Sequence, residues 1–162
     1  MSDVFFDTSV VVAHMRGRYD SLERAGRQNT VFISATVLGE LWHGIRKSAS
    51  PDQGKTLLAL FLGQVGVLHP DEGTAEIYGT IAASLERKGA KIPVNDIWIA
   101  AAALECGLPL ATSDSHFNAW MDFSRSERCK RNNESNEDRP FHQQIELCNC
   151  VHFLARVSVP LQ

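Results

Sequence analysis

The sequence predicts an α/β domain with a mainly parallel sheet, and two observations lead to this prediction. Short apolar runs with the composition of buried strands occur at residues 4–6, 31–33, 65–68 and 108–111. Segments with apolar residues at helical spacing lie between these runs. Strands that alternate with helices favour a parallel sheet, because a helix then connects each strand to the next.

Six helices are predicted. They span residues 10–14, 21–25, 35–47, 51–62, 72–88 and 97–105. Residues that cap helix N-termini precede three of them: Ser34, Asp71, and either Asn95 or Asp96. These caps place the helix starts directly after predicted strands or loops.

The helix at 51–62 has the most complete start signal. Ser50 is a capping residue, Pro51 takes the first helical position, and Gln53 lies three residues after the cap. This spacing predicts a capping box. Gly89 and Gly107 follow the next two helices and are typical helix stops.

Length and composition limit the class of protein. The chain has 162 residues, of which 44% are hydrophobic and 22% charged, which suits one ordinary globular domain. It has 16 Lys and Arg against 19 Asp and Glu, a net charge of −3, which excludes a strongly basic nucleic-acid binder but not a local basic patch. No apolar run approaches the roughly 20 residues of a membrane span, and the N-terminus lacks a signal-peptide pattern. We therefore expect a cytoplasmic protein with no membrane partner.

The cysteines offer only a weak metal-site pattern. Cys148 and Cys150 lie near His142 and His152, a spacing that matches no common zinc site. We interpret the four cysteines of the chain as ordinary reduced thiols.

Four acidic residues lie in unusual positions. Asp7 and Asp114 follow predicted strands, Asp96 lies at a helix start, and Glu40 lies on an apolar helix. In a parallel sheet the carboxyl ends of the strands and the starts of the following helices meet at one edge. We therefore expect the four carboxylates to lie close together.

Clustered carboxylates require a counter-charge, because they repel one another when ionised. Mg²⁺ or Mn²⁺ supplies it, since these ions take oxygen ligands and bridge carboxylates to phosphates. The pattern thus predicts metal-dependent phosphate chemistry at Asp7, Glu40, Asp96 and Asp114.

Each acidic residue also has a purely structural interpretation. Asp7 and Asp96 are suitable helix caps, and Asp114 is a suitable turn residue. An arginine is the expected partner if Glu40 is only a buried structural acid.

Other phosphate and acyl chemistries lack their motifs. The sequence contains no G-x-x-x-x-G-K-[ST] loop, no G-x-G-x-x-G after a strand, and no G-x-S-x-G elbow. Asp7 also lacks the second aspartate, two residues on, of aspartate-nucleophile phosphatases.

Four segments, in order, resemble a PIN domain: VFFDTSVVVAHM, SATVLGELWHGI, PVNDIWIAAAALECGLPLAT and SDSHF. The resemblance is strongest to the VapC-type ribonuclease toxins of bacterial toxin–antitoxin pairs. It implies a PIN-like nuclease domain over residues 1–120, with an atypical tail over 121–162. It also implies a three-layer α/β/α sandwich with a mainly parallel sheet of four to five strands.

The resemblance implies a role for each motif residue. Asp7, Glu40, Asp96 and Asp114 match the family's catalytic, metal-binding acids, and the implied activity is a Mg²⁺-dependent (or Mn²⁺-dependent) endoribonuclease. The polar positions that would support them are Thr8, Ser9, Asn95 and Thr112.

The resemblance also implies partners: an RNA substrate, a second copy in a homodimer, and a cognate VapB-like antitoxin. Cations that could track RNA are Arg16, Arg18, Arg24, Arg27, Arg46 and Lys47, although a solvated surface explains each equally well. Trp42 and Trp98 are candidate antitoxin contacts, with core packing as the alternative. A PIN-like module that binds RNA or protein without cutting, and a DNA-directed nuclease, are the alternative functions.

The tail departs from the family pattern. Residues 124–146 are rich in charge and amide groups and are predicted to be weakly structured, whereas residues 151–159 could form a final strand.

Overall fold

The computed structural model describes residues 3–18 and 30–114. The elements, in chain order, are β1 (Val4–Phe6), α1 (Thr8–Met15), β2 (Val31–Ser34), α3 (Ala35–Lys47), α4 (Pro51–Leu62), β3 (Gly66–Leu68), α5 (Glu72–Arg87), α6 (Val94–Glu105) and β4 (Leu110–Ala111). The helix predicted at 21–25, the tail from residue 121 and its strand at 151–159 lie outside the described residues. Within them, no helix is long and apolar enough to cross a bilayer.

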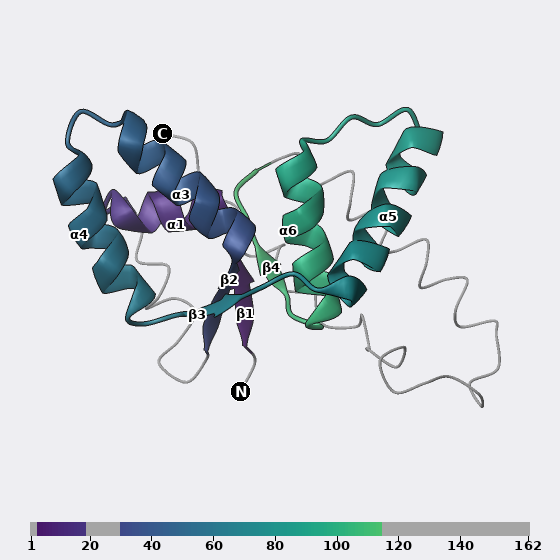
Figure 1. Cartoon of the computed structure of the whole chain (residues 1–162), viewed down its shortest axis with the longest axis horizontal. Helices are drawn as coiled ribbons and strands as arrows, with labels where there is room; N and C mark the ends of the chain where they lie inside the picture. The colour runs from purple at the N-terminus through teal and green to yellow at the C-terminus, as the bar shows by residue number, and fades with distance from the viewer. Residues whose placement is uncertain (1–2, 19–29, 115–162) are drawn as a thin grey trace.

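The strands form one parallel sheet in the order β3-β2-β1-β4 (Figure 1). β1 lies inside the sheet and pairs with β2 through Val4 and Val31, and with β4 through Phe5 and Leu110. The prediction of a mainly parallel sheet is confirmed, with four strands in the described part of the chain.

Two strands begin later than predicted. β3 begins at Gly66, and β4 at Leu110 rather than at Leu108. The Leu108 N–H donates to the Ala103 carbonyl at the end of α6, and Pro109 has no N–H to donate. Pairing of β4 with β1 therefore starts at the Pro109 carbonyl, which accepts from the Phe5 N–H (2.9 Å).

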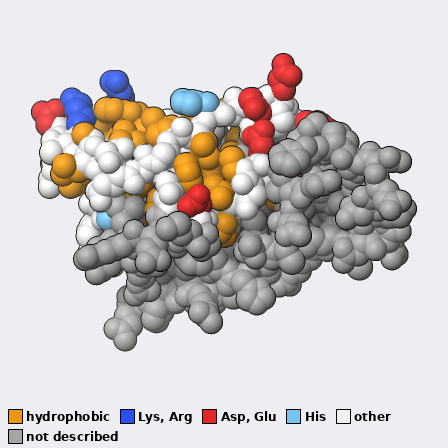
Figure 2. Space-filling model, turned by 90° about the horizontal axis from the view of Figure 1, so that it is seen from below, with side chains coloured by type: hydrophobic (Ala, Val, Ile, Leu, Met, Phe, Trp, Pro, Cys, Tyr) orange, Lys and Arg blue, Asp and Glu red, His pale blue; other side chains and the backbone are white. Residues whose placement is uncertain are grey.

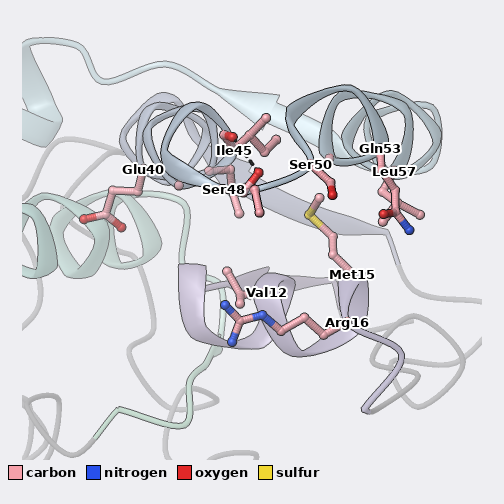
Figure 3. A pocket seen from close by; sticks show the side chains of 13 residues that line it. Val12, Met15, Arg16, Glu40, Ile45, Ser48, Ser50, Gln53 and Leu57 are labelled. Atoms are coloured by element: carbon pink, nitrogen blue, oxygen red, sulfur yellow. Dashed lines mark hydrogen bonds between the residues drawn. The ribbon is translucent and has the colours of Figure 1, made fainter.

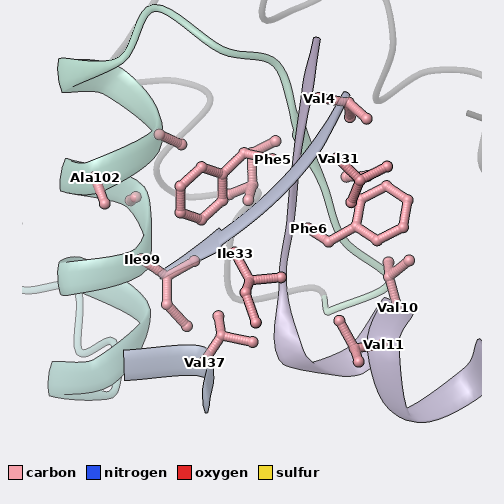
Figure 4. Close-up of a cluster of buried hydrophobic side chains, with 14 of the residues drawn as sticks. Val4, Phe5, Phe6, Val10, Val11, Val31, Ile33, Val37, Ile99 and Ala102 are labelled. Carbon is pink, nitrogen blue, oxygen red and sulfur yellow. The ribbon is translucent and has the colours of Figure 1, made fainter. Parts of the chain in front are cut away.

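Helices cover both faces of the sheet. Figure 1 shows α1, α3 and α4 on one side and α5 and α6 on the other. Phe5 points toward α6 and Phe6 toward α1, so successive residues of β1 pack against helices on opposite faces of the sheet (Figure 4). Both rings are 2% exposed or less, which explains why β1 is an uninterrupted apolar run. The α/β/α sandwich is the predicted architecture.

The predicted starts of α3 and α5 are confirmed, and in each a side chain accepts a hydrogen bond from a backbone N–H of the first turn. Ser34 Oγ accepts from the Val37 N–H, and Asp71 forms a capping box with Thr74. The helix stops are also confirmed: Gly89 and Gly107 have φ values of 64° and 63°, which a side chain would oppose.

Two predicted helix caps are wrong. Pro51 begins α4 as expected, but the Ser50 side chain caps nothing, because its backbone (φ −131°, ψ 69°) is not in the usual capping conformation and its side chain lines a pocket instead. α6 begins at Val94, with Pro93 as its N-cap. Asn95 and Asp96 therefore lie in the first turn of α6, and neither is its N-cap.

A second acidic cluster joins α5 to α6 at the end of the molecule where the strands begin. The Thr74 hydroxyl donates to Glu105 Oε2, and Asp71 Oδ1 accepts from the Gly73 N–H (2.8 Å). Seen from below in Figure 2, acidic side chains gather on the α5 half of this end, and hydrophobic ones are exposed on the α4 half. Burial raises the pKa of Glu105, and the hydrogen bond with Glu105 lowers the pKa of Asp71.

These opposite shifts set a pH dependence of stability. The contribution of Glu105 is full below its ordinary pKa and is lost as pH rises through its raised value, whereas that of Asp71 is lost as pH falls through its lowered value. Glu105→Gln imitates the protonated acid, so we expect it to raise the Tm at neutral pH and to have little effect in mild acid. Thermal unfolding at about pH 4 and about pH 7.5 measures this. Glu72→Gln is the control, and an equal gain at both pH values would contradict the expectation.

Candidate active site

The predicted acidic residues lie at the edge of the sheet where the strands end. Asp7 directly follows β1, and Asp114 lies three residues after β4. Glu40 lies in the second turn of α3, and Asp96 in the first turn of α6. In Figure 1 this edge is the region where α3 and α6 approach each other above the strands. We call these four residues the acidic site.

Asp7 is held most completely. Its side chain is 4% exposed and caps α1, with Oδ1 accepting from the Thr8 N–H (2.6 Å). Oδ2 accepts from the Ser9 hydroxyl (2.7 Å) and from the Thr112 hydroxyl (2.8 Å). Asp7 is thus both the structural cap that the sequence allowed and a charged group fixed by hydroxyls from two segments.

Glu40 joins three helices. Its Oε2 accepts from the Thr8 hydroxyl of α1, and its Oε1 accepts from Asn95 Nδ2 of α6 (2.7 Å). These contacts of Glu40 are with a threonine and an asparagine, and not with the arginine that the structural alternative predicted. A hydroxyl and an amide orient the carboxylate without neutralising its charge.

Asp96 and Asp114 lie beside this network. Asp96 is half-buried, and its Oδ2 is shielded from solvent. Asp114 is also half-buried, and its N–H donates to the Thr112 hydroxyl (2.9 Å), which itself contacts Asp7. The cap interpretation of Asp96 is wrong, since Pro93 is the N-cap.

The predicted supporting residues all contact the network. Thr8 and Asn95 hold Glu40, while Ser9 and Thr112 hold Asp7. The Ser9 hydroxyl also accepts from the N–H of Ser113 (3.1 Å). These contacts connect α1, α3, α6 and the residues after β4.

The donors of the site suit a hard cation. Carboxylate, hydroxyl and amide oxygens are ligands for Mg²⁺ or Mn²⁺, and the network contains no thiolate or imidazole. Over residues 3–18 and 30–114, no three Asp, Glu, His or Cys side chains are arranged to hold one ion together. Mg²⁺ usually takes only one or two carboxylates and keeps its waters. The residues fit such an ion, and the four-carboxylate metal site stays a prediction.

The predicted cations lie around the site at different distances. Arg16 lines a pocket together with Glu40, and Arg18 is exposed just after α1. Arg46 and Lys47 are exposed in the last turn of α3. Arg24 and Arg27 lie outside the described residues.

Sequence reasoning missed the pocket, a groove of about 560 Å³ between α1, α3 and the start of α4. Figure 3 shows Glu40 at one end, Gln53 and Leu57 at the other, and Arg16 along α1. Leu41, Ile45 and Leu57 make much of its lining apolar. Gly44 and Gly54 also line it, and a Cβ at Gly54 would lie 3.0 Å from Ile45, so this glycine lets α4 pack close to α3.

The two tryptophans differ. Trp42 is 37% exposed, so core packing does not explain it. Trp98 stacks on Tyr78 with ring centroids 4.3 Å apart, which is a packing contact between α6 and α5.

Comparison with known proteins gives consistent matches. Ribonuclease VapC2 of Rickettsia felis is 32% identical over 112 residues, covering 67% of this chain and 84% of that protein. Ribonuclease VapC4 of Mycobacterium tuberculosis is 31% identical over 118 residues, covering 72% and 89%.

Solved structures give the same result. The crystal structure of VapBC2 from Rickettsia felis, bound to a DNA fragment from its promoter, matches with a TM-score of 0.67 and 30% identity, over 72% of this chain and 91% of that one. The family model of the PIN domain matches residues 4–120. With its parallel sheet and the acidic site at its carboxyl edge, the chain belongs to the PIN domain family, and its named relatives are VapC ribonucleases.

Proposed function

We propose that this protein is a Mg²⁺- or Mn²⁺-dependent endoribonuclease that acts as the toxin of a type II toxin–antitoxin pair. The observation that supports this most is the network of hydroxyl and amide donors that orients the carboxylates of Asp7 and Glu40. The VapC ribonucleases among its relatives support the substrate class.

We propose that Asp7 and Asp96 would ligate the ion directly, and that Glu40 and Asp114 would contact it through its bound waters. When bound, the ion supplies charge that neutralises the scissile phosphate and activates a water molecule for in-line attack. The hydroxyls of Ser9 and Thr112 hold the Asp7 carboxylate in place for this role.

Glu40 is the group we propose to accept a proton. Each of its oxygens accepts one hydrogen bond and keeps a further lone pair, through which it can take a proton from the attacking water. Thr8 and Asn95 fix the direction of these lone pairs. Attack by water needs no covalent intermediate, so the products would have a 5′-phosphate and a 3′-hydroxyl.

RNA would approach through the surrounding cations. We propose phosphate contacts for Arg16, which lines the pocket with Glu40, and for the exposed side chains of Arg18, Arg46 and Lys47. The cytoplasm, where RNA is present and thiols stay reduced, is the compartment we propose.

The groove between α1, α3 and α4 is the place we propose for the VapB-like antitoxin. An amphipathic segment would lay apolar side chains against Leu41 and Ile45 and bring a basic residue to Glu40 at the groove's end. Solved VapBC complexes among the similar structures support such a partner. Slower amide hydrogen exchange in α1 and α3 when the antitoxin binds would check this placement.

We also propose that the protein forms a homodimer, which sedimentation measures.

The proposed function predicts growth arrest and metal-dependent cleavage. Induced expression should stop growth, and the purified chain should cut bulk RNA with Mg²⁺ but not with EDTA, because the acidic residues alone cannot neutralise the phosphate. Restored cleavage on adding Mg²⁺ back is the control for damage by EDTA. Cleavage that persists in EDTA would contradict the metal requirement. RNA binding without cleavage under any condition would instead favour a non-cutting module.

A further inference from the structure

One face of α3 runs outward from the acidic site. Successive residues of a helix are turned by about 100°, so His43 and Lys47 lie within roughly 60° and 20° of Glu40 around the axis. They stand about 4.5 Å and 10.5 Å further along α3 than Glu40. Glu40, His43 and Lys47 therefore form one line, which we call the α3 track.

The direction of the track is set by Glu40. Its Oε1 accepts from Asn95 in the first turn of α6, so this face of α3 looks toward the beginning of α6. The buried side chains of α3, Val37, Leu41 and Ile45, lie on a different face. In Figure 1, α3 rises from the end of β2 away from the sheet, so the track leads from the site toward solvent.

Packing does not explain the two residues of the track beyond Glu40. His43 and Lys47 are both exposed. Lys47 lies in the last turn, where a cation stabilises the helix dipole, but Arg46 already supplies a charge there. Arg46 is turned about 120° from Glu40 and so lies off the track.

We propose that His43 and Lys47 bind the backbone phosphates of RNA next to the scissile bond; this inference rests on the proposed ribonuclease function. A substrate that approaches four carboxylates is repelled by them, so donors beside the site are needed to hold its backbone. An imidazole N–H and an ammonium group both donate to phosphate oxygens without reading the base. The track thus gives affinity and register rather than sequence preference.

The test measures cleavage of one labelled single-stranded RNA oligonucleotide of mixed sequence over a series of salt concentrations. For Lys47→Ala we expect the KM to rise about threefold to tenfold with kcat nearly unchanged, and the slope of log KM against log salt to fall by about 0.7. His43→Ala should raise the KM by roughly threefold, and His43→Asn, which keeps an N–H donor, should recover part of the loss.

Lys55→Ala is the matched control. Lys55 is an exposed cation of α4 that pairs with Asp52, whose side chain is 95% exposed, so its loss leaves no buried charge. It should change neither KM nor salt slope. Unchanged KM and salt slope in both Lys47→Ala and His43→Ala would overturn the inference, as would a loss confined to kcat and accompanied by a lower Tm.

A separate measurement distinguishes this inference from the proposed function. Fluorescence anisotropy in EDTA records binding of the same RNA by the full chain without cleavage. If the wild type does not cut RNA yet binds it with the same dependence on His43 and Lys47, the nuclease proposal fails and the phosphate track stands. If the wild type neither cuts nor binds, both fail.

Discussion

Asp96→Asn is expected to reduce RNA cleavage by about 10³-fold or more. The substitution removes one negative charge from the proposed metal ligands, and the bound ion would supply several kcal/mol of stabilisation to the phosphate. The substitution keeps the size and the first-turn position of the side chain in α6. RNA affinity in EDTA and the Tm should stay near those of the wild type. Initial cleavage rates at saturating RNA and Mg²⁺ measure the loss.

Asp7→Asn should abolish cleavage as well, but with a cost to stability. Oδ2 of Asp7 accepts from both the Ser9 and the Thr112 hydroxyls, so an amide nitrogen in its place would force both to turn, and in the other orientation it would face the Thr8 N–H. We expect a loss of about 1 kcal/mol in the free energy of unfolding.

Asp52→Asn, which changes an exposed carboxylate on α4, is the control for both variants. Cleavage by Asp96→Asn at more than a tenth of the wild-type rate would remove Asp96 from the proposed site.

Phe5→Ala is expected to lower the free energy of unfolding by about 3–5 kcal/mol, the cost of an aromatic cavity in a packed core. Phe5 is 0% exposed and lies on β1, between β2 and β4. Its ring packs toward α6, the helix of Asn95 and Asp96 (Figure 4). Urea unfolding followed by circular dichroism measures the change.

Leu60→Ala is the comparison for this variant. Leu60 lies on α4 and is 63% exposed, so its truncation should change the free energy of unfolding by about 0.5 kcal/mol or less. Equal effects of the two substitutions would mean that β1 does not form the centre of the core.

Local patterns in the sequence predicted the parallel sheet and most helix boundaries because these depend on neighbouring residues. Aspartate and serine are common helix caps, as Asp71 and Ser34 are here. A glycine such as Gly89 ends a helix because its backbone can adopt a positive φ. The start of α6 was misplaced because Asn95 has the residue type of a cap, while its side chain is used in a contact with Glu40, 55 positions away.

The site could be predicted only in part, for the same reason. The positions of Asp7 and Glu40 after a strand and on an apolar helix indicated an acidic cluster, and their place at one edge of the sheet agrees with that. The strand order and the groove beside Glu40 depend on packing between distant segments. Neither has a local signature, because each is set by the shapes of several helices together.

The hydrogen bond between Thr112 and Asp7 joins residues that are 105 positions apart. The acidic site therefore needs one of the last segments of the domain to leave the ribosome. A nascent chain that has emerged only as far as α5 contains Asp7 and Glu40, but neither Asn95 nor the hydroxyl of Thr112. Such an intermediate has the contacts of Thr8 and Ser9 but lacks one hydrogen bond to each carboxylate. The orientation of the acidic site is therefore completed only by Asn95 and Thr112, near the end of the PIN domain match at residue 120.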